Sequence, residues 1–197
     1  MNVSSLGLTL SGLFANIVIP SFSSVNSPVF DVSKATSRKI PKMPLSAKSK
    51  ELSRTIAKKI NANSEDIEAV IYAESGGNPQ AINSSGGASG LIQFTRSTAI
   101  SLGTTVEALR KMTAEEQMVY VEKYLIKAKG MAKFKEGEKL SGADVYALVF
   151  CPARARQEKF YHKGTQEYEL NKSCDLNGDG VITKTEMAIR AGFKANG

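Results

Sequence analysis

The sequence predicts a mainly α-helical protein, on three observations. From residue 48 onwards apolar residues recur at helical spacing, as in Leu52, Ile56 and Ile60, which fall on one face of a helix. No long stretch alternates apolar and polar residues as a half-buried strand does. With 197 residues, 42% of them apolar and 23% charged, the chain can form one well-packed domain with appendages.

Residues 1–47 differ from the rest, and we expect them to form an N-terminal arm for assembly or anchoring. The first part of this arm is rich in Ser and apolar residues and carries no charge before Asp31. An export signal is the alternative, although the early Lys or Arg of such a signal is missing. No membrane span is predicted, because Ser, Gly, Asn and Pro interrupt the apolar run. Pro41 and Pro44 mark the end of the arm.

The net charge of +7 is concentrated in one band. Between Lys34 and Lys59 there are nine basic residues and a single acid, Glu51. Such a band indicates contact with something anionic, and nucleic acid, a membrane surface and anionic cell-wall polymers all qualify. No nucleic-acid partner is predicted, because no aromatic residues interleave with the band and no nucleic-acid motif accompanies it. A solvated basic helix face is the simpler interpretation.

Cys151 and Cys174 are the only cysteines, and His162 is the only histidine. Two cysteines are too few for a disulfide framework, and their spacing fits no zinc pattern. Either both stay reduced or they form one bridge. A lone histidine gives little support to a His-based catalytic triad or a His-rich metal site.

Capping residues predict where the further helices begin and end. Ser64 can cap a helix whose first turn carries Glu65 and Asp66, where the helix dipole favours acids. Later starts carry the capping boxes Thr104-x-x-Glu107, Thr113-x-x-Glu116 and Ser141-x-x-Asp144. The predicted stops are Gly76, Gly103, Gly130 and Pro152.

Glu74 occupies an unusual position on the helix that starts near Ser64. The apolar residues of this helix are Ile67, Val70 and Ile71, and the same spacing continues to Glu74. The acid therefore faces the core at the helix C-terminus, where burial and the helix dipole both raise the pKa of a carboxyl group. A raised pKa is what a general acid needs near neutral pH. A helix-end Glu that turns out to water is the alternative.

The segment that follows Glu74 suits a polyhydroxylated ligand. Its glycines let a ligand approach the backbone closely, and residues such as Asn78 offer neutral hydrogen bonds. Residues 75–89 contain no Asp or Glu, which is compatible with a mechanism that uses one acid.

Two blocks of this region resemble the signature of the lysozyme-like lytic transglycosylases, the SLT domain family. The first is Glu74-Ser-Gly-Gly-Asn-Pro, and the second, ending at Phe94, is Gly-Ala-Ser-Gly-Leu-Ile-Gln-Phe, with Ile92 in place of the usual Met. The Ala-Tyr-Asn segment of many members is absent. Instead, residues 144–153 resemble the Asp-Leu-Tyr-x-x-x-Phe variant of phage-associated members, with Tyr146 as the counterpart of the motif tyrosine. The resemblance covers about residues 48–160 and implies a lysozyme-like helical fold with little sheet.

The resemblance implies cleavage of the β-1,4 bond between N-acetylmuramic acid and N-acetylglucosamine in peptidoglycan glycan strands. Glu74 would be the single catalytic acid: it would protonate the leaving oxygen and then take a proton from the muramic acid 6-hydroxyl, giving a 1,6-anhydro product. A hydrolysing muramidase with a distant second acid remains an alternative. The residues expected to bind or position substrate are Ser75, Asn78, Gln93 and Tyr146.

The arm and the phage-like block favour an enzyme of the virion, in a phage tail or baseplate, that opens the wall locally. Tail or baseplate proteins would then be partners of the arm. The alternatives are a bacterial periplasmic transglycosylase of a secretion or conjugation machine, and a non-catalytic structural tail protein that binds the wall.

Residues 175–186, DLNGDGVITKTE, match every position of the calcium loop D-x-[DN]-x-[DN]-G-x5-E. Because only one loop is present, a structural Ca²⁺ is favoured over a calcium switch. The chain is thus divided into the arm over 1–47, a lysozyme-like transglycosylase domain over 48–164 and an EF-hand-like segment over 165–197. The expected ligands are Asp175, Asn177, Asp179, the Val181 carbonyl and Glu186.

Overall fold

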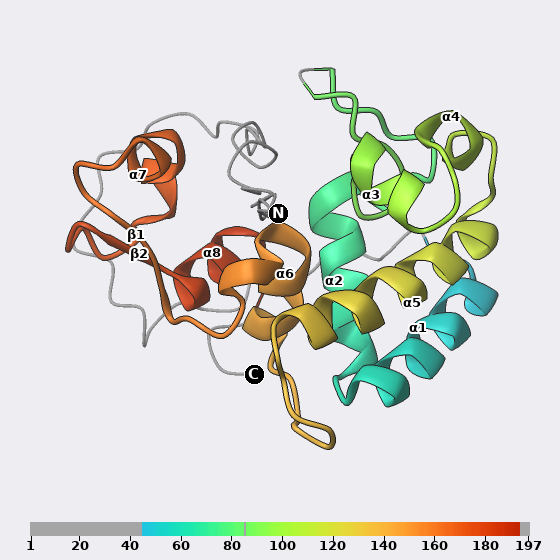
Figure 1. The fold of residues 1–197 in the computed structure, drawn as a ribbon, viewed down its shortest axis with the longest axis horizontal. Coiled ribbons are helices and arrows are strands. Elements are labelled where there is room, and N and C mark those ends of the chain that lie inside the picture. The colour runs from blue at the N-terminus through green and yellow to red at the C-terminus, as the bar shows by residue number, and fades with distance from the viewer. Residues whose placement is uncertain (1–44, 85, 194–197) are drawn as a thin grey trace, which may run out of the picture.

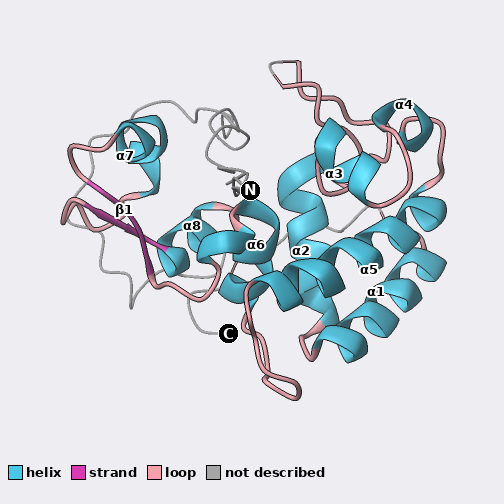
Figure 2. Ribbon diagram, in the orientation of Figure 1, coloured by secondary structure: helices cyan, strands magenta, loops and turns pink. Residues whose placement is uncertain are grey.

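The computed structural model describes residues 45–84 and 86–193 of the chain. Most of the predicted arm, and the part of the basic band before Leu45, lie outside these residues. The described part is mainly helical, with one sheet of two short strands (Figures 1 and 2), so the predicted fold class is confirmed.

Four longer helices form the body of the fold. Helix α1 packs against both α2 and α5, and α6 packs against α2 and α5. Two short helices lie beyond the C-terminal end of α2 (Figure 1), in the segment that links α2 to α5. The bounds are α1 Ala47–Ile60, α2 Ser64–Ser75, α3 Arg96–Ser101, α4 Val106–Leu109, α5 Ala114–Met131 and α6 Gly142–Phe150.

The C-terminal part lies on the other side of α6 from α2 (Figure 1). Its two strands are antiparallel, with Tyr161 opposite Ile182, and its last helix packs on α6. Ile182, at position 8 of the calcium-type loop, is fully buried. The bounds are β1 Lys159–His162, α7 Gln166–Asn171, β2 Val181–Thr183 and α8 Lys184–Arg190, with 3-10 turns at Pro152–Arg154 and Lys172–Cys174.

One hydrophobic core runs through both parts. Buried side chains of the helical body, such as Ile71 and Leu148, belong to the same cluster as Met187 and Phe193 near the C-terminus. The Phe193 ring lies 5.6 Å from the ring of Tyr146 on α6. The C-terminal segment therefore completes the core around α6.

A largely buried ion pair also joins α8 to α6. The Lys184 ammonium lies 2.5 Å from the Asp144 carboxylate and donates to the Ala155 carbonyl at 3.2 Å. Burial alone would raise the pKa of Asp144, but hydrogen bonds from Lys184 and Ser141 hold that pKa below its usual value. Because Asp144 also caps α6, this pair fixes the start of that helix.

The predicted helix ends are correct in part. The capping boxes of Thr113 and Ser141 are confirmed, and Gly76 ends α2 in the left-handed conformation. The cap of α2 is Asn63 and not Ser64, and that of α4 is Thr105 and not Thr104, because those residues hold the extended backbone that precedes each helix.

Helix α5 does not stop at Gly130. It continues to Met131, because Ala128 and Ala132 on either side of the glycine are buried and packing outweighs propensity.

Both cysteines are free thiols, with Cys174 buried and Cys151 partly buried. Within residues 45–84 and 86–193, no helix has the length and apolar character to cross a membrane.

Candidate active site

Glu74 is the penultimate residue of α2, and its side chain is only partly exposed. The residues that precede it on the same face, Ile67, Val70 and Ile71, are 1%, 2% and 0% exposed. The predicted apolar stripe is therefore confirmed, and it ends in a carboxyl group at the rim of the core.

Among the described residues, none donates a hydrogen bond to the Glu74 carboxyl and none forms an ion pair with it. Burial raises its pKa from an ordinary value of 4.5 to about 7, and no neighbouring charge contributes. This predicted rise in pKa is confirmed, and its cause is desolvation. The carboxyl therefore holds its proton to a higher pH than an exposed glutamate does.

Two tyrosines stand near the Glu74 carboxyl. Burial, and after it the charge of Glu74, raises the pKa of both Tyr124 on α5 and Tyr146 on α6. Tyr146 is 3% exposed, and its ring stacks on Phe150 at 6.0 Å. In this structure Tyr146 is thus part of the wall behind Glu74, whereas the sequence analysis expected it to touch substrate.

Tyr124, which the sequence analysis did not single out, has a defined place beside Glu74. Its hydroxyl donates to the carbonyl of Leu148 at 3.0 Å, and its ring meets Phe94 edge-on at 6.3 Å. Tyr124 therefore links α5, α6 and the end of the Gly-rich segment around Glu74. The sequence pattern that could have pointed to Tyr124 is the pattern that pointed to Glu74: a polar group next to the apolar stripe of a helix.

Ser75 joins the end of α2 to the Gly-rich segment. Its hydroxyl lies 2.9 Å from both the Ile71 and the Leu91 carbonyl oxygens, to one of which it donates, and it accepts from the Gly77 N–H at 3.2 Å. These contacts favour a role for Ser75 in positioning Glu74 over direct contact between Ser75 and a ligand.

The Gly-rich segment forms a narrow hairpin that extends past α3 (Figure 1). Isolated bridges pair Ser89 with Ile82 and with Phe94, and Arg110 holds the hairpin through the Ser89 hydroxyl at 2.8 Å. Asn78, at the start of the hairpin, is exposed, and its side-chain oxygen accepts from the Gln80 N–H at 2.9 Å.

Gln93 ends the hairpin in a left-handed conformation, with φ of 53°, and its amide donates to the Gly90 carbonyl at 3.1 Å. Both Asn78 and Gln93 retain polar atoms for a ligand. The structure thus places Ser75, Asn78 and Gln93 on the segment that follows Glu74.

Gln117 is a supporting residue that the sequence analysis missed. Its side chain is fully buried, and its amide oxygen accepts from the Leu91 N–H at 2.9 Å. Its amide nitrogen donates to the carbonyls of Pro79 at 2.6 Å and Leu109 at 2.8 Å. A Cβ at Gly90 would lie 2.4 Å from the Gln117 oxygen, so this contact requires glycine. The two ends of the hairpin are therefore held by one buried amide.

The calcium-type loop is closed by its own side chains. The Asp175 carboxylate accepts from the N–H groups of Gly178 at 2.8 Å and Gly180 at 3.0 Å, and from the Tyr168 hydroxyl at 2.6 Å. Asn177 accepts from the Asp179 N–H at 2.9 Å. The side chains at loop positions 1 and 3 thus turn inward.

The second half of the loop is held in the same way. Asp179 accepts from the Val181 N–H at 2.8 Å. Glu186, 2% exposed, accepts from the Leu176 N–H at 3.1 Å and the Thr183 N–H at 2.9 Å. In the part of the chain that the structure describes, no three His, Cys, Asp or Glu side chains are grouped so that they could hold a metal ion.

Residues 51–121 match the family described as Transglycosylase SLT domain. The matched range runs from α1 into α5 and contains Glu74, Ser75, Asn78 and Gln93, but ends before Tyr146 and the calcium-type loop. The match supports a lytic transglycosylase acting on peptidoglycan, and the mainly helical structure is consistent with the lysozyme-like fold of that family. Neither the curated proteins nor the solved structures contain a match.

Replacing Glu74 by Gln is expected to stabilise the fold at alkaline pH. The folded-state pKa is raised to about 7, so the contribution of Glu74 to stability is present below its unfolded value of 4.5 and is lost as the pH rises through 7. Urea denaturation should give Glu74→Gln a free energy of unfolding about 3 kcal/mol above wild type near ~pH 8, and no such gain near ~pH 4. The control is Glu65→Gln, which replaces an exposed acid on the same helix. If Glu74→Gln and wild type differed in free energy of unfolding by the same amount at both pH values, burial would not be the cause of the raised pKa.

Proposed function

We propose that this protein is a peptidoglycan lytic transglycosylase that cleaves the MurNAc-β-1,4-GlcNAc bond with Glu74 as its catalytic acid. The observation that carries the proposal is the Glu74 carboxyl, which has no partner in the part of the chain that the structure describes and whose pKa burial raises to about 7. A group with this pKa is protonated often enough to act as an acid at neutral pH and ionises readily once it has given up its proton. The family match over residues 51–121, which contains Glu74, supports the substrate class.

In the proposed reaction, the protonated Glu74 donates its proton to the glycosidic oxygen as the bond to the muramic acid C1 breaks. Positive charge develops on the sugar ring in an oxocarbenium-like transition state. The Glu74 carboxylate then removes the proton of the muramic acid 6-hydroxyl, and that oxygen bonds to C1. The products are a GlcNAc end and a 1,6-anhydro-MurNAc end, and the carboxyl regains its proton.

The surroundings of Glu74 suit a reaction that needs one carboxyl group. Within residues 45–84 and 86–193, no second acid contributes to the raised pKa of Glu74, and residues 75–89 supply no acid. A retaining glycosidase of the two-carboxylate type would need a second carboxyl group about 5 Å away. A hydrolytic muramidase that uses a more distant acid is the second candidate, and its products differ.

The residues around the acid have proposed roles that follow from their contacts. Gln93 and Asn78 bind the sugar through their free amide atoms, and Ser75 holds the Gly-rich hairpin next to Glu74. Tyr146 keeps water away from the back of the carboxyl group, which maintains its raised pKa.

The proposal is tested by mass spectrometry of purified peptidoglycan after digestion. Wild type should release 1,6-anhydro-muropeptides, and Glu74→Gln should lower their rate of formation by about 100-fold or more, because a general acid is lost. Glu68→Gln, on the same helix and also partly buried, is the matched control and should keep its activity.

Reducing-end products from wild type would instead identify a hydrolase. If neither wild type nor the control gave products, the protein would be a wall-binding structural component without catalysis.

We further propose that the enzyme is carried in the virion of a phage, in its tail or baseplate, and reaches the bacterial wall during infection. The support is the sequence of residues 1–47 and the phage-like block around Tyr146. On this account the arm stays attached and binds tail proteins. A bacterial periplasmic enzyme of a secretion or conjugation machine would lose the arm on export.

The N-terminus of the mature protein separates these two locations. Intact-mass and N-terminal peptide analysis of the protein, recovered from its native particle or cell, should find residues 1–47 present. A mature chain that begins after the arm would contradict the virion proposal and favour the periplasmic enzyme.

We also propose that the loop over residues 175–186 binds a structural Ca²⁺. The support is the complete motif, with side-chain oxygens from Asp175, Asn177, Asp179 and Glu186 and the carbonyl of Val181. Because Thr183 and Glu186 cap α8, an occupied loop would stabilise the packing of α8 on α6.

Isothermal titration with Ca²⁺ tests this site. Wild type should bind one ion and show a higher melting temperature in its presence, whereas Asp175→Ala should do neither. Glu167→Gln, an exposed acid outside the loop, is the control and should behave as wild type. Indistinguishable titrations of wild type and Asp175→Ala would remove the site.

A further inference from the structure

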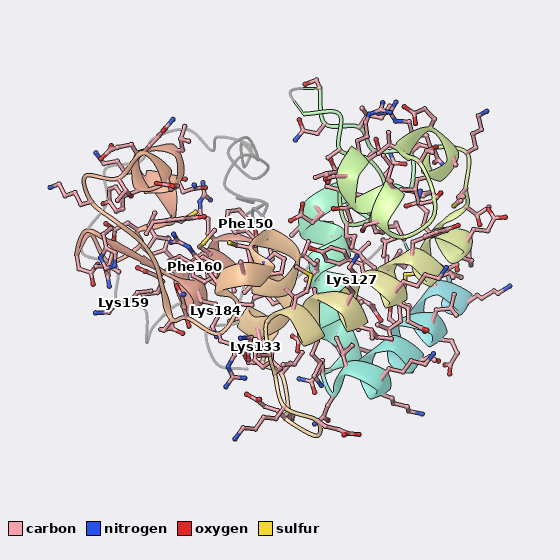
Figure 3. All side chains as sticks on the ribbon, in the orientation of Figure 1. Lys127, Lys133, Phe150, Lys159, Phe160 and Lys184 are labelled. Carbon is pink, nitrogen blue, oxygen red and sulfur yellow. The ribbon has the colours of Figure 1, made fainter. Side chains whose placement is uncertain are left out.

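Basic side chains gather at one end of the molecule, around the loop that links α5 to α6. This loop extends below the helical body in Figure 1, and Figure 3 labels Lys133 at its base. We name this group the basic pole, and it consists of Lys58, Lys59, Lys129, Lys133, Lys135, Lys139 and Arg156.

Hydrogen bonds bring these residues together from three segments. Asn61, just after α1, donates to the Gly137 carbonyl at 2.7 Å and accepts from the Leu140 N–H at 2.8 Å. The Lys129 ammonium donates to the Ile60 carbonyl at 2.7 Å. The end of α1, the end of α5 and the loop over residues 132–140 therefore form one surface.

Arg156 joins the same surface from beyond α6. Its guanidinium contacts the Glu138 carboxylate at 2.9 Å and lies over the Phe134 ring at 4.9 Å. These contacts hold the loop in place, so its lysines project from an ordered backbone.

The positive charge of the pole is only partly compensated. Glu122 pairs with Lys59 at 2.7 Å and Glu138 pairs with Arg156. Two further acids lie at the pole: Glu136 is exposed in the loop itself, and Asp66 is close enough for the Lys139 charge to lower its pKa. Within the described ranges, no acid forms an ion pair with the four remaining exposed lysines, which are Lys58, Lys133, Lys135 and Lys139. Exposed ammonium groups on long side chains attract anionic groups whose positions vary.

The basic pole is separate from the candidate active site. Helix α2 begins beside it, at Ser64, and reaches Glu74 at its other end. A helix rises 1.5 Å per residue, so about 15 Å separates the two ends of this stretch. A ligand at the pole would therefore leave the Glu74 carboxyl accessible.

We propose that the basic pole binds the carboxylates of the peptide stems of peptidoglycan, which keeps the enzyme on the wall while Glu74 acts on a glycan strand. This inference rests on the proposed function. Peptide stems repeat along every strand and carry free carboxylates at changing positions, so they suit several lysines better than one fixed pocket. A surface of this kind raises the local substrate concentration without taking part in the reaction.

Co-sedimentation with purified sacculi, stripped of phosphate-containing polymers, tests the inference. The variant is Lys133→Gln/Lys135→Gln/Lys139→Gln in full-length Glu74→Gln protein, so that the wall is not digested. Its Kd for sacculi should be about tenfold higher than that of the Glu74→Gln parent. On peptide-free glycan strands, prepared with an amidase, the two proteins should bind equally.

The control is Lys111→Gln/Lys159→Gln/Lys172→Gln, which removes the same charge from other exposed positions and should bind sacculi as the parent does. Equal binding of the basic-pole variant and the parent to sacculi would overturn the inference, as would an equal loss on peptide-free glycan. Tighter binding of the parent to duplex DNA or to anionic lipid vesicles than to sacculi would also overturn it. Soluble muropeptides released by the Glu74→Gln parent would show that Glu74 is not the catalytic acid, so failure of the proposed function is seen separately from a failure of binding.

Discussion

Desolvation of the Glu74 carboxyl is the constraint around which the candidate site is arranged. An ion-pair partner or a hydrogen-bond donor would favour the carboxylate and lower the pKa towards its ordinary value. The structure supplies neither, and instead surrounds the group with the apolar face of α2 and two tyrosines from α5 and α6. Their main shared effect is to exclude water, so the chemistry of the site depends on how closely these helices pack.

That packing depends in turn on the C-terminal segment. Helix α6 lies between α2 on one side and α8 on the other, and the Lys184–Asp144 pair and the Phe193 ring hold it from the α8 side. The family match ends at residue 121, so Tyr124 and Tyr146, the two tyrosines near Glu74, lie outside the matched range. The calcium-type loop leads directly into α8, which gives it a structural connection to α6.

Local patterns predicted the parts of the site that are contiguous in sequence. The helical spacing of Ile67 and Ile71 located Glu74, and the Gly-rich composition located the hairpin beside it. Contacts over long sequence distances were not predictable in this way. Gln117 bonds to Leu91 across 26 positions, and the burial of Tyr146 depends on Phe193, which lies beyond the EF-hand motif. Gly130 was misjudged because burial of its neighbours outweighed its own low helix propensity.

The most direct test of the central claim is a ¹³C NMR titration of the Glu74 side-chain carboxyl, assigned by the loss of its signal in Glu74→Gln. The account predicts a midpoint near 7, well above the ordinary value of 4.5. A midpoint near 4.5 would mean that water or an ionic partner reaches the carboxylate in solution. It would contradict the claim that burial raises the pKa of Glu74.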